Sequence, residues 1–306
     1  MKRDFLSLAD YSRTELESIL EDAARLKADL RAGRGARPLI GKTLAMIFEK
    51  PSLRTRVTFE TGIKQLGGAS VYLAPGDIQL GARETVADIA RNLSRWVDLI
   101  MARTFSHASM IELAEHATIP VINGLSDLLH PCQVMADCQT LLELRGRLEG
   151  LTVAFIGDGN NVVGSWLHAA SRFGIHFRLA CPPGYEPDPR ITEEMRQTGV
   201  GSIEIVHDPA LAATDADVLY TDVWTSMGQE AESQRRRTAF AEYQVNAALL
   251  ARARSDAIVM HCLPAHRGEE ISSEVVDGPQ AVVLEQAENR LHAQKAIMIR
   301  LAAGPV

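Results

Sequence analysis

The chain of 306 residues, of which 46% are hydrophobic and 23% charged, is long enough for two domains of ordinary size. Its formal net charge of −7 argues against a general nucleic-acid binder, which would be basic overall. No apolar run approaches the roughly 18 residues of a membrane span, and the amino terminus lacks the apolar core of a signal peptide. We therefore expect a soluble, cytoplasmic protein that binds neither nucleic acid nor a membrane.

The 4 cysteines of the chain follow no spacing typical of a zinc site. We expect free thiols, as in a reducing cytoplasm, and no metal ion.

The first half of the chain alternates between predicted helices and strands. Helices are expected over residues 12–30, 52–68, 84–97, 109–117 and 130–146, and strands over residues 42–49, 70–74, 98–104 and 120–125. Ser12 and Glu15 have the spacing of a capping box at the start of the first helix.

The alternation breaks near residues 146–150 and then restarts. Strands are expected over residues 151–158, 177–182, 202–208, 217–224 and 257–264, each followed by a helical pattern, and the last helix over residues 287–303. Repeated β-α units predict parallel sheets with helices on both faces. The sequence therefore predicts an α/β protein with two doubly wound parallel-sheet domains. In such sheets, ligands bind beyond the carboxyl ends of the strands.

The stretch PSLRTR follows a predicted strand and opens a helix. Free backbone N–H groups and the helix dipole make such a terminus an anion site. Ser52 and Thr55 add hydroxyl groups, and Arg54 adds a planar guanidinium that suits phosphate. Helix residues two apart point to nearly opposite sides, so Arg54 and Arg56 cannot both face one ligand. We expect Arg54 to bind the anion and Arg56 to form a structural ion pair. The alternative is a solvated, capped helix with surface arginines.

Other donor groups follow later strands. Arg103 ends one strand, and His130 and Gln133, three residues apart and so on one face, open a helix. With PSLRTR they offer N–H, guanidinium, hydroxyl and imidazole groups, which suit a phosphate beside a polarised carbonyl. The same groups would stabilise an oxyanion that develops on that carbonyl.

The stretch FIGDGNNVVGS imitates a dinucleotide-binding loop. Gly157 and Gly159 fit the start of G-x-G-x-x-G, but Val162 takes the third glycine position, and the next strand ends without an acidic residue for a ribose. We therefore do not expect a nicotinamide or flavin site. Asn160 and Asn161 at the helix start could instead bind a small carboxylate.

Two later strands end in motifs that suit an amine. In DVWTSMGQE, Asp222 can hold an ammonium group, with Ser226 and Met227 close behind it. In HCLPAHRGEE, the neighbours His261 and Cys262 point to opposite faces of a strand, so His261 is poorly placed as a base for Cys262. We expect a polar contact from Cys262 to a substrate amine.

Seven stretches resemble, in order and spacing, the motifs of ornithine carbamoyltransferases in the aspartate/ornithine carbamoyltransferase family: FEKPSLRTR, MART, HPCQ, GDGNN, DVWTSMG, HCLP and EAENR. The resemblance covers nearly the whole chain. PSLRTR and HPCQ are typical of the wider family, whereas DVWTSMG with HCLPAHRGEE resembles the ornithine-side motifs. Many family members carry threonine where this chain has Leu53, which keeps a backbone N–H but loses a hydroxyl group.

The resemblance implies a set of site residues. The catalytic residues would be Arg54, Thr55, Arg103, His130 and Cys262. The carbamoyl phosphate site would comprise Ser52, Leu53, Arg54, Thr55, Gln79, Arg103, His130, Pro131, Cys132, Gln133, Cys262, Leu263 and Arg290. The ornithine site would comprise Asn161, Asp222, Ser226 and Met227. Gln79 would reach the site of a neighbouring subunit.

The resemblance also implies a division of labour between the domains. Residues 1–146 would bind carbamoyl phosphate, joined by the C-terminal helix, about 287–306, which returns to this first domain. Residues 147–286 would bind ornithine. The expected assembly is a homotrimer or a multiple of trimers, with no metal ion or organic cofactor.

The implied reaction transfers the carbamoyl group of carbamoyl phosphate to the δ-amine of L-ornithine and gives L-citrulline and phosphate. It belongs to arginine metabolism, and biosynthesis is the expected direction. The alternative is a carbamoyltransferase for another amine: an N-acylornithine, putrescine or aspartate. Leucine at position 53 also resembles enzymes that act on acylated ornithine, so the acceptor needs an experiment.

Overall fold

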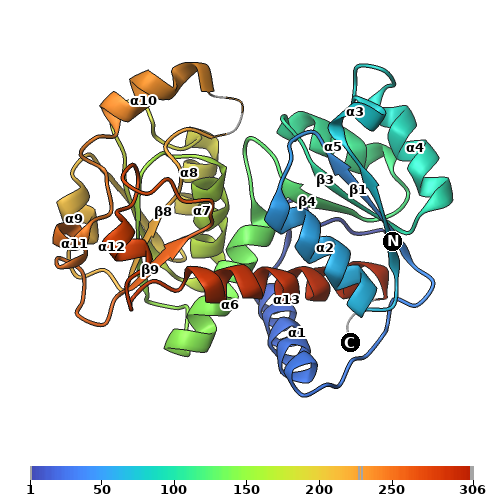
Figure 1. The fold of residues 1–306 in the computed structure, drawn as a ribbon, viewed down its shortest axis with the longest axis horizontal. Coiled ribbons are helices and arrows are strands. Elements are labelled where there is room, and N and C mark those ends of the chain that lie inside the picture. The colour runs from blue at the N-terminus through green and yellow to red at the C-terminus, as the bar shows by residue number, and fades with distance from the viewer. Residues whose placement is uncertain (1, 227, 229, 304–306) are drawn as a thin grey trace. The chain divides into compact units, whose positions relative to one another are not determined.

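The computed structural model describes residues 2–226, 228 and 230–303. It divides into two compact units, Met1–Gln139 with Glu288–Val306, and Thr140–Ala287. Each unit is built on one parallel sheet with helices on both faces (Figure 1). The C-terminal helix α13, Val283–Ala302, packs against the first unit. The predicted fold class is therefore confirmed, including the return of the last helix.

The first unit holds a four-stranded sheet in the order β2-β1-β3-β4, with every neighbouring pair parallel. Its strands are β1 Thr43–Phe48, β2 Ala69–Leu73, β3 Leu99–Arg103 and β4 Val121–Leu125. Its helices are η1 Leu8–Asp10, α1 Arg13–Arg31, α2 Leu53–Gln65, α3 Pro75–Ile78, α4 Val86–Trp96 and α5 His107–His116, followed by the start of α6, Pro131–Arg145.

The core of the first unit has two layers because side chains of a strand alternate between the faces of the sheet. Ala45 and Ile47 of β1 pack with α4 and α5 on one face. Elsewhere in the unit α2 approaches α13 closely at Gly62, where an added Cβ would lie 3.1 Å from the Met298 side chain. At the start of α1, Ser12 and Glu15 form the predicted capping box.

The second unit holds a five-stranded parallel sheet in the order β7-β6-β5-β8-β9. Its strands are β5 Thr152–Ile156, β6 His176–Ala180, β7 Ser202–Val206, β8 Val218–Thr221 and β9 Ile258–His261. Its helices are α7 Asn161–Phe173, α8 Pro189–Gln197, α9 Pro209–Ala213, η2 Glu230–Glu232, α10 Ser233–Ala239, α11 Ala247–Leu250 and α12 Ser273–Val276.

Aromatic side chains fill one face of the second sheet. The rings of Phe155 and Tyr220 stack with centroids 5.2 Å apart, and Trp166 of α7 meets Tyr220 at 5.8 Å and Phe177 at 6.2 Å. On the other face, a separate hydrophobic cluster joins the strands to α9, α11 and α12. Both faces are thus covered, as parallel sheets require.

Each sheet has one point at which successive strands change direction across the sheet, between β1 and β3 in the first unit and between β5 and β8 in the second. Ligands of open α/β sheets bind outside the carboxyl ends of the strands at such points. Of the predicted motifs, PSLRTR and MART lie at the ends of β1 and β3, and GDGNN and DVWTSMG lie at the ends of β5 and β8, whereas HPCQ and HCLP lie at the ends of β4 and β9. The topology therefore places the first four where a binding site is expected.

The structure differs from the predicted elements in the bounds of several of them. The last helix begins at Val283, four residues earlier than predicted, because the chain leaves the edge of β9 at Val282 and the Gln286 N–H bonds to the Val282 carbonyl. The short helix α3 was not predicted, since its four residues are too few to show a helical period. Among the described residues, no helix is both long and apolar enough to cross a membrane.

Candidate functional site

The amino end of α2 is built by Ser52, its N-cap residue. The Ser52 hydroxyl accepts a hydrogen bond from the Thr55 N–H at 3.3 Å and donates to Thr55 Oγ1 at 3.1 Å. Leu53 is the first helical residue, and its side chain is 74% exposed. The hydroxyl of Ser52 satisfies one of the free N–H groups of the first turn, and other N–H groups there remain able to bind an anion.

Arg290 of α13 is held from two directions in the first unit. It donates from Nη1 to Gln133 Oε1 at 2.9 Å and from Nη2 to Thr55 Oγ1 at 3.0 Å. Gln133 in turn donates to Asp137 at 2.8 Å. All of these side chains are buried. The network fixes the orientation of the Arg290 guanidinium inside the last helix, where the sequence predicts this arginine.

His130 lies just before α6, and the positive charges of three arginines act on its imidazole. Burial lowers the pKa of its imidazole well below the usual value, and the positive charges of Arg290, Arg103 and Arg54 lower it further. Arg103 ends β3 and is itself buried, and Arg54 is half-buried on α2. His130 is therefore a neutral hydrogen-bonding group in a strongly positive environment. Such an environment favours an anion rich in oxygen atoms.

Cys132 and Pro131 form the first turn of α6. The Cys132 side chain is fully buried and its thiol donates to the Asn123 carbonyl at 3.4 Å. Burial raises the pKa of this thiol to about 12. The Cys132 side chain is therefore an inert packing group, and only the backbone of this turn can meet a ligand.

Gln79 ends the short helix α3 in a left-handed conformation, with φ of 47° and ψ of 64°. Its side chain is exposed and borders a cavity of about 210 Å³ with Phe48, Leu80 and Phe105. The structure thus places Gln79 on a projecting loop of the first unit.

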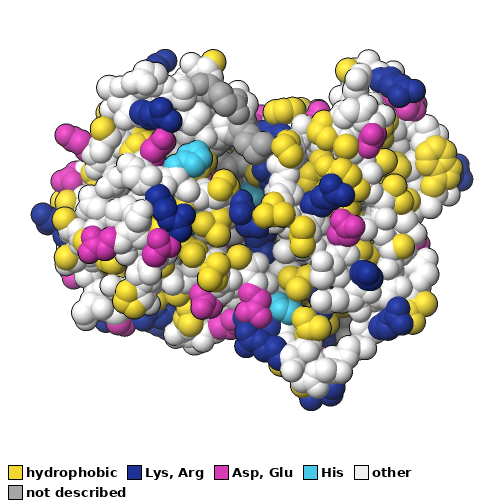
Figure 2. All heavy atoms as spheres, viewed as in Figure 1, with side chains coloured by type: hydrophobic (Ala, Val, Ile, Leu, Met, Phe, Trp, Pro, Cys, Tyr) yellow, Lys and Arg dark blue, Asp and Glu magenta, His cyan; other side chains and the backbone are white. Residues whose placement is uncertain are grey.

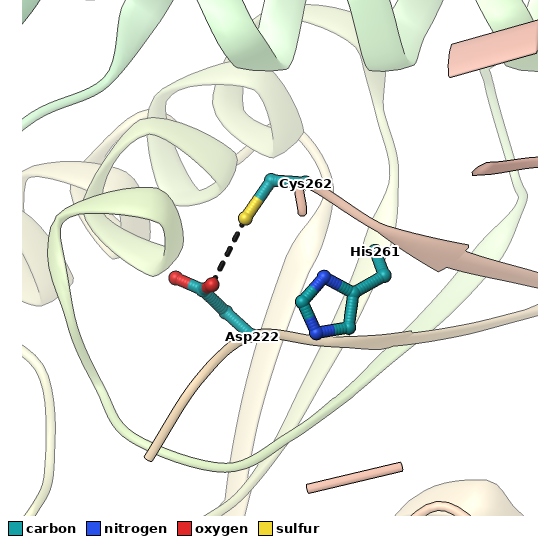
Figure 3. A group of neighbouring side chains, drawn as sticks. All are labelled: Asp222, His261 and Cys262. Atoms are coloured by element: carbon teal, nitrogen blue, oxygen red, sulfur yellow. Dashed lines mark hydrogen bonds between the residues drawn. The ribbon is translucent and has the colours of Figure 1, made fainter. Parts of the chain in front are cut away.

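In the second unit, Asp222 follows β8, and its carboxylate accepts hydrogen bonds from three donors. The Cys262 thiol lies 3.0 Å from Asp222 Oδ1, which also accepts the Val223 N–H at 2.8 Å. Oδ2 accepts from the Asn160 side chain at 2.9 Å. Figure 3 shows the thiol of Cys262 pointing at the carboxylate of Asp222, with the ring of His261 nearby. The ring nitrogens of His261 bond to Glu270 and to the Leu263 N–H, which agrees with the expectation that His261 is poorly placed as a base for Cys262.

Asn160 is a residue whose role the sequence did not predict correctly. It is the N-cap of α7, and its side-chain oxygen accepts the N–H groups of Val162 and Val163 while its amide holds Asp222. Asn161 is the first residue of the helix and half-buried. Ser226 is likewise half-buried, and Met227 lies outside the described residues.

A buried ion pair joins the GDGNN stretch to α10. Arg236 donates to Asp158 Oδ2 at 3.0 and 3.3 Å, and its guanidinium lies over the rings of Tyr185, at 5.0 Å, and Phe240, at 5.9 Å. Burial raises the pKa of Asp158 to about 6, although the charge of Arg236 opposes this. The pair fixes α10 beside the loop that carries Asp222 and was not predicted.

Asp222, His261 and Cys262 each offer a possible metal ligand atom, all within 4.8 Å of one another. Both ring nitrogens of His261 are already hydrogen-bonded, to Glu270 and to the Leu263 N–H. A metal ion would have to break one of these bonds. The group is better suited to hydrogen bonding than to metal binding.

Comparison with known protein families matches both units. Residues 3–143 match the carbamoyl-P binding domain of aspartate/ornithine carbamoyltransferase, and residues 149–301 match the Asp/Orn binding domain of the same family.

Relatives that match over nearly their whole length belong to the same family. The chain is 54% identical over 305 residues to an ornithine carbamoyltransferase from Thermococcus kodakarensis, covering 99% of this chain and 97% of the relative. It is 56% identical over 304 residues to one from Symbiobacterium thermophilum, covering 98% of each. The solved ornithine carbamoyltransferase from Pyrococcus furiosus superimposes with a TM-score of 0.95 at 51% identity, covering 99% of this chain and 98% of that one. The chain is a member of the aspartate/ornithine carbamoyltransferase family.

Proposed function

We propose that this chain transfers the carbamoyl group of carbamoyl phosphate to the δ-amine of L-ornithine, giving L-citrulline and phosphate. The observation that carries the proposal is the neutral, buried His130 among the charges of Arg54, Arg103 and Arg290 at one end of the first sheet. These groups suit a phosphate bonded to a carbonyl carbon, because the phosphate offers several acceptor oxygens and the carbonyl offers one more. The match of residues 3–143 to a carbamoyl-P binding domain supports the same ligand.

In the first unit, the phosphate lies at the amino end of α2, against Arg54 and the N–H groups that follow Ser52. Arg103, Thr55 and His130 stabilise the oxyanion that forms on the carbamoyl carbon when the amine attacks. Neutral His130 donates one hydrogen bond without adding a charge. Arg290 is held in place by Gln133 and Thr55, so its positive charge keeps a fixed position near His130. Catalysis by such a site consists of positioning and electrostatics.

In the second unit, Asp222 and Ser226 hold the α-amino group of ornithine, and Asn161 holds its carboxylate. Cys262 lies at Asp222, where it can contact the substrate amine. The δ-amine must be neutral to attack, so the rate rises with pH until that amine is deprotonated in the complex. The amine nitrogen first bonds to the carbamoyl carbon, and the carbonyl becomes the oxyanion. The carbon–oxygen bond to phosphate then breaks as the carbonyl re-forms, and the proton lost from the nitrogen passes to the departing phosphate.

The acceptor is ornithine in preference to aspartate, putrescine or an N-acylornithine. Relatives covering almost the whole chain at 51–56% identity carry the name ornithine carbamoyltransferase. Leu53 is exposed, and its backbone N–H still belongs to the first turn of α2, as it would with threonine at this position. Loss of the threonine hydroxyl at this position is therefore compatible with phosphate binding.

We infer a homotrimer in which Gln79 reaches the site of a neighbouring chain. Gln79 projects from an exposed loop. Leu53, Val57 and Val71 are 74%, 49% and 46% exposed on α2 and β2, which contact each other. Figure 2 shows hydrophobic side chains gathered near α2 on the face that it draws. An apolar surface of this kind is typical of contacts between subunits.

We place the reaction in arginine biosynthesis in the cytoplasm. One relative at 51% identity, from Pyrococcus furiosus, is named an anabolic ornithine carbamoyltransferase. The four cysteines are free and buried, which suits a reducing compartment.

The proposal is tested by mixing the purified protein with carbamoyl phosphate and L-ornithine and measuring phosphate and citrulline together. Equal amounts of both products, dependent on each substrate, are expected. Phosphate release that does not depend on ornithine, with no citrulline, would contradict the proposal. Arg103→Met serves as the matched control, because it removes one charge near His130 and should abolish both products together.

A further inference from the structure

A buried carboxylate in the second unit has one oxygen atom without a partner. Glu270 is 0% exposed. Its Oε1 accepts the backbone N–H of His266 and lies 3.1 Å from Nε2 of His261. Its Oε2 is buried as well, and it has no hydrogen-bond partner among the described residues. A carboxylate oxygen that has lost its water without compensation is costly, so Oε2 calls for a donor or a cation.

The neighbours of Glu270 do not supply the missing positive charge. The backbone N–H of Leu263 donates to Nδ1 of His261 at 2.8 Å. A backbone N–H can only donate, so Nδ1 carries no hydrogen and the ring of His261 is neutral. Within the described ranges, no lysine or arginine forms an ion pair with Glu270. Buried charges in proteins are paired or bind metal ions, and this one has no charged pair.

The turn before Glu270 brings two further metal-ligating side chains to it. The Glu269 N–H donates to the His266 carbonyl at 2.9 Å, and the Gln244 side chain donates to the carbonyls of Gly268 and Glu269 at 3.0 and 2.9 Å. A ring nitrogen of His266 and one carboxylate oxygen each of Glu269 and Glu270 lie within 4.8 Å of one another. The backbone of the turn is thus fixed by its own hydrogen bonds, and three ligand atoms gather at the buried carboxylate.

Glu269 keeps one oxygen for a ligand although it forms an ion pair. Arg237 contacts Oε1 of Glu269 at 2.9 Å, whereas Oε2 lies 3.9 Å from Nδ1 of His266. Two ligands of a tetrahedral zinc ion, each roughly 2.0–2.2 Å from the ion, are about 3.4 Å apart. The His266 side chain is 51% exposed and the Glu269 side chain 30%, so both are able to close on an ion that enters from solvent.

We propose that His266, Glu269 and Glu270 bind one divalent transition-metal ion of the Zn²⁺ class. One imidazole and two carboxylates are ligands that Zn²⁺ accepts, and a water molecule completes its four-coordinate shell. Mg²⁺ prefers oxygen ligands alone and fits this set less well. The ion balances the buried charge of Glu270 and ties the turn to it. The expectation of no metal ion rested on the spacing of the cysteines, none of which is a ligand here.

A test must separate this site from the group of Asp222, His261 and Cys262, whose possible ligand atoms also lie within 4.8 Å of one another. His266→Ala removes a ligand of the proposed site alone. Cys262→Ala removes the thiol of the other group. His176→Ala is the matched control, because it removes an exposed imidazole elsewhere in the second unit.

The measurement is a calorimetric titration of the full chain, without a histidine tag, with Zn²⁺. The parent, Cys262→Ala and His176→Ala proteins should each bind one ion with the same affinity. His266→Ala and Glu269→Gln should bind at least about a hundredfold more weakly, because losing even an outer partner of a metal ligand costs about 10–100-fold. Mg²⁺ should bind far more weakly than Zn²⁺ to the parent.

Two further readouts follow from the same site. Bound Zn²⁺ should raise the midpoint of thermal unfolding in the parent and in Cys262→Ala, but not in His266→Ala at the same concentration, because a ligand stabilises only the state that binds it. Co²⁺ in place of Zn²⁺ should show no charge-transfer absorption from sulfur, because no thiolate is bound. Unfolding without an ion checks the fold of each variant, and if Glu269→Gln fails to fold, His266→Ala still decides.

Three results would overturn the proposal. The first is a parent protein without saturable Zn²⁺ binding, which would mean that water or a proton satisfies Oε2 of Glu270. The second is binding that survives in His266→Ala and is lost in Cys262→Ala, which would place the ion at the other group. The third is equal binding by His266→Ala and His176→Ala, which would show that His266 is not a ligand.

Discussion

The guanidinium group of Arg56 lies over the ring of Tyr72, with its central carbon 3.8 Å from the ring centroid. Arg56 also forms an ion pair with Glu60 at 3.5 Å, one turn along α2. Arg54, two residues earlier, instead contributes its positive charge to the environment of His130. The two arginines of PSLRTR therefore serve different neighbours, as helical geometry predicts.

We predict opposite consequences for the two arginines. Arg54→Ala removes a charge beside His130 and should lower kcat/KM by about 10²–10³-fold with the fold intact. Arg56→Ala removes a cation–π contact and an exposed ion pair, and should lower the free energy of unfolding by about 1 kcal/mol with nearly normal activity. Steady-state kinetics and denaturant unfolding measure both. An Arg56→Ala protein as inactive as Arg54→Ala, but equally stable to the parent, would refute this division.

The hydroxyl of Thr55 gives a second prediction. Thr55→Val keeps the shape of the side chain but removes the hydroxyl that accepts from Arg290, so the guanidinium loses this hydrogen bond. We expect KM for carbamoyl phosphate to rise by about tenfold, the equivalent of one hydrogen bond. Thr58→Val is the matched control, because that hydroxyl bonds only within α2, to the Arg54 carbonyl at 2.6 Å. Equal effects of the two substitutions would show that Thr55 does not act through Arg290.

His130 gives a prediction on pH and stability. Its pKa in the folded protein is lowered by burial and by neighbouring arginines. In the unfolded chain it titrates near 6.5, so below about pH 6.5 the unfolded state binds more protons and the free energy of unfolding falls. This loss approaches about 1.4 kcal/mol per pH unit. His130→Asn should remove it.

The test compares unfolding of the parent and His130→Asn proteins at about pH 7.5 and about pH 5.5, where the parent should lose about 1.4 kcal/mol more than the variant. Asp158, whose pKa is raised to about 6, contributes with the opposite sign, but it is present in both proteins and cancels in the difference. Equal losses would mean that His130 titrates normally when folded.

The Asp158–Arg236 pair gives a fourth prediction. Arg236→Met leaves the carboxylate of Asp158 buried without its charge partner, and we expect a loss of about 3–5 kcal/mol in the free energy of unfolding. Adding Asp158→Asn should recover part of this loss, because the unpaired charge is then gone. A double-mutant cycle measures the coupling, and simple additivity would contradict it. The exposed pair of Arg190 and Asp188 is the control, and Arg190→Met should have little effect.

Much of this fold is readable from the sequence because its signals are local. Alternating apolar strands and helices predict the two parallel sheets, and the motifs lie at the strand ends where the chain changes direction. The separation of Arg54 from Arg56 follows from the period of the helix alone.

The partners of these residues could not be predicted from local pattern. Arg290 bonds to Thr55 across 235 residues, and Arg236 bonds to Asp158 across 78. Such pairs depend on how distant elements pack, which no residue spacing records. Asn161 was predicted as a site residue from its place at the start of α7, which is a local signal. The bond of its neighbour Asn160 to Asp222 joins distant segments and was not predicted.

The choice of amine acceptor is the central claim, and a competition among acceptors tests it most directly. The measurement is kcat/KM for formation of the ureido product from carbamoyl phosphate with L-ornithine, N-acetyl-L-ornithine, putrescine and L-aspartate in turn. The account predicts citrulline formation at least about 10²-fold above every other product, because a site built for a charged amino-acid end group rejects analogues that leave its polar groups unpaired. A higher kcat/KM for any of the other three amines would contradict it.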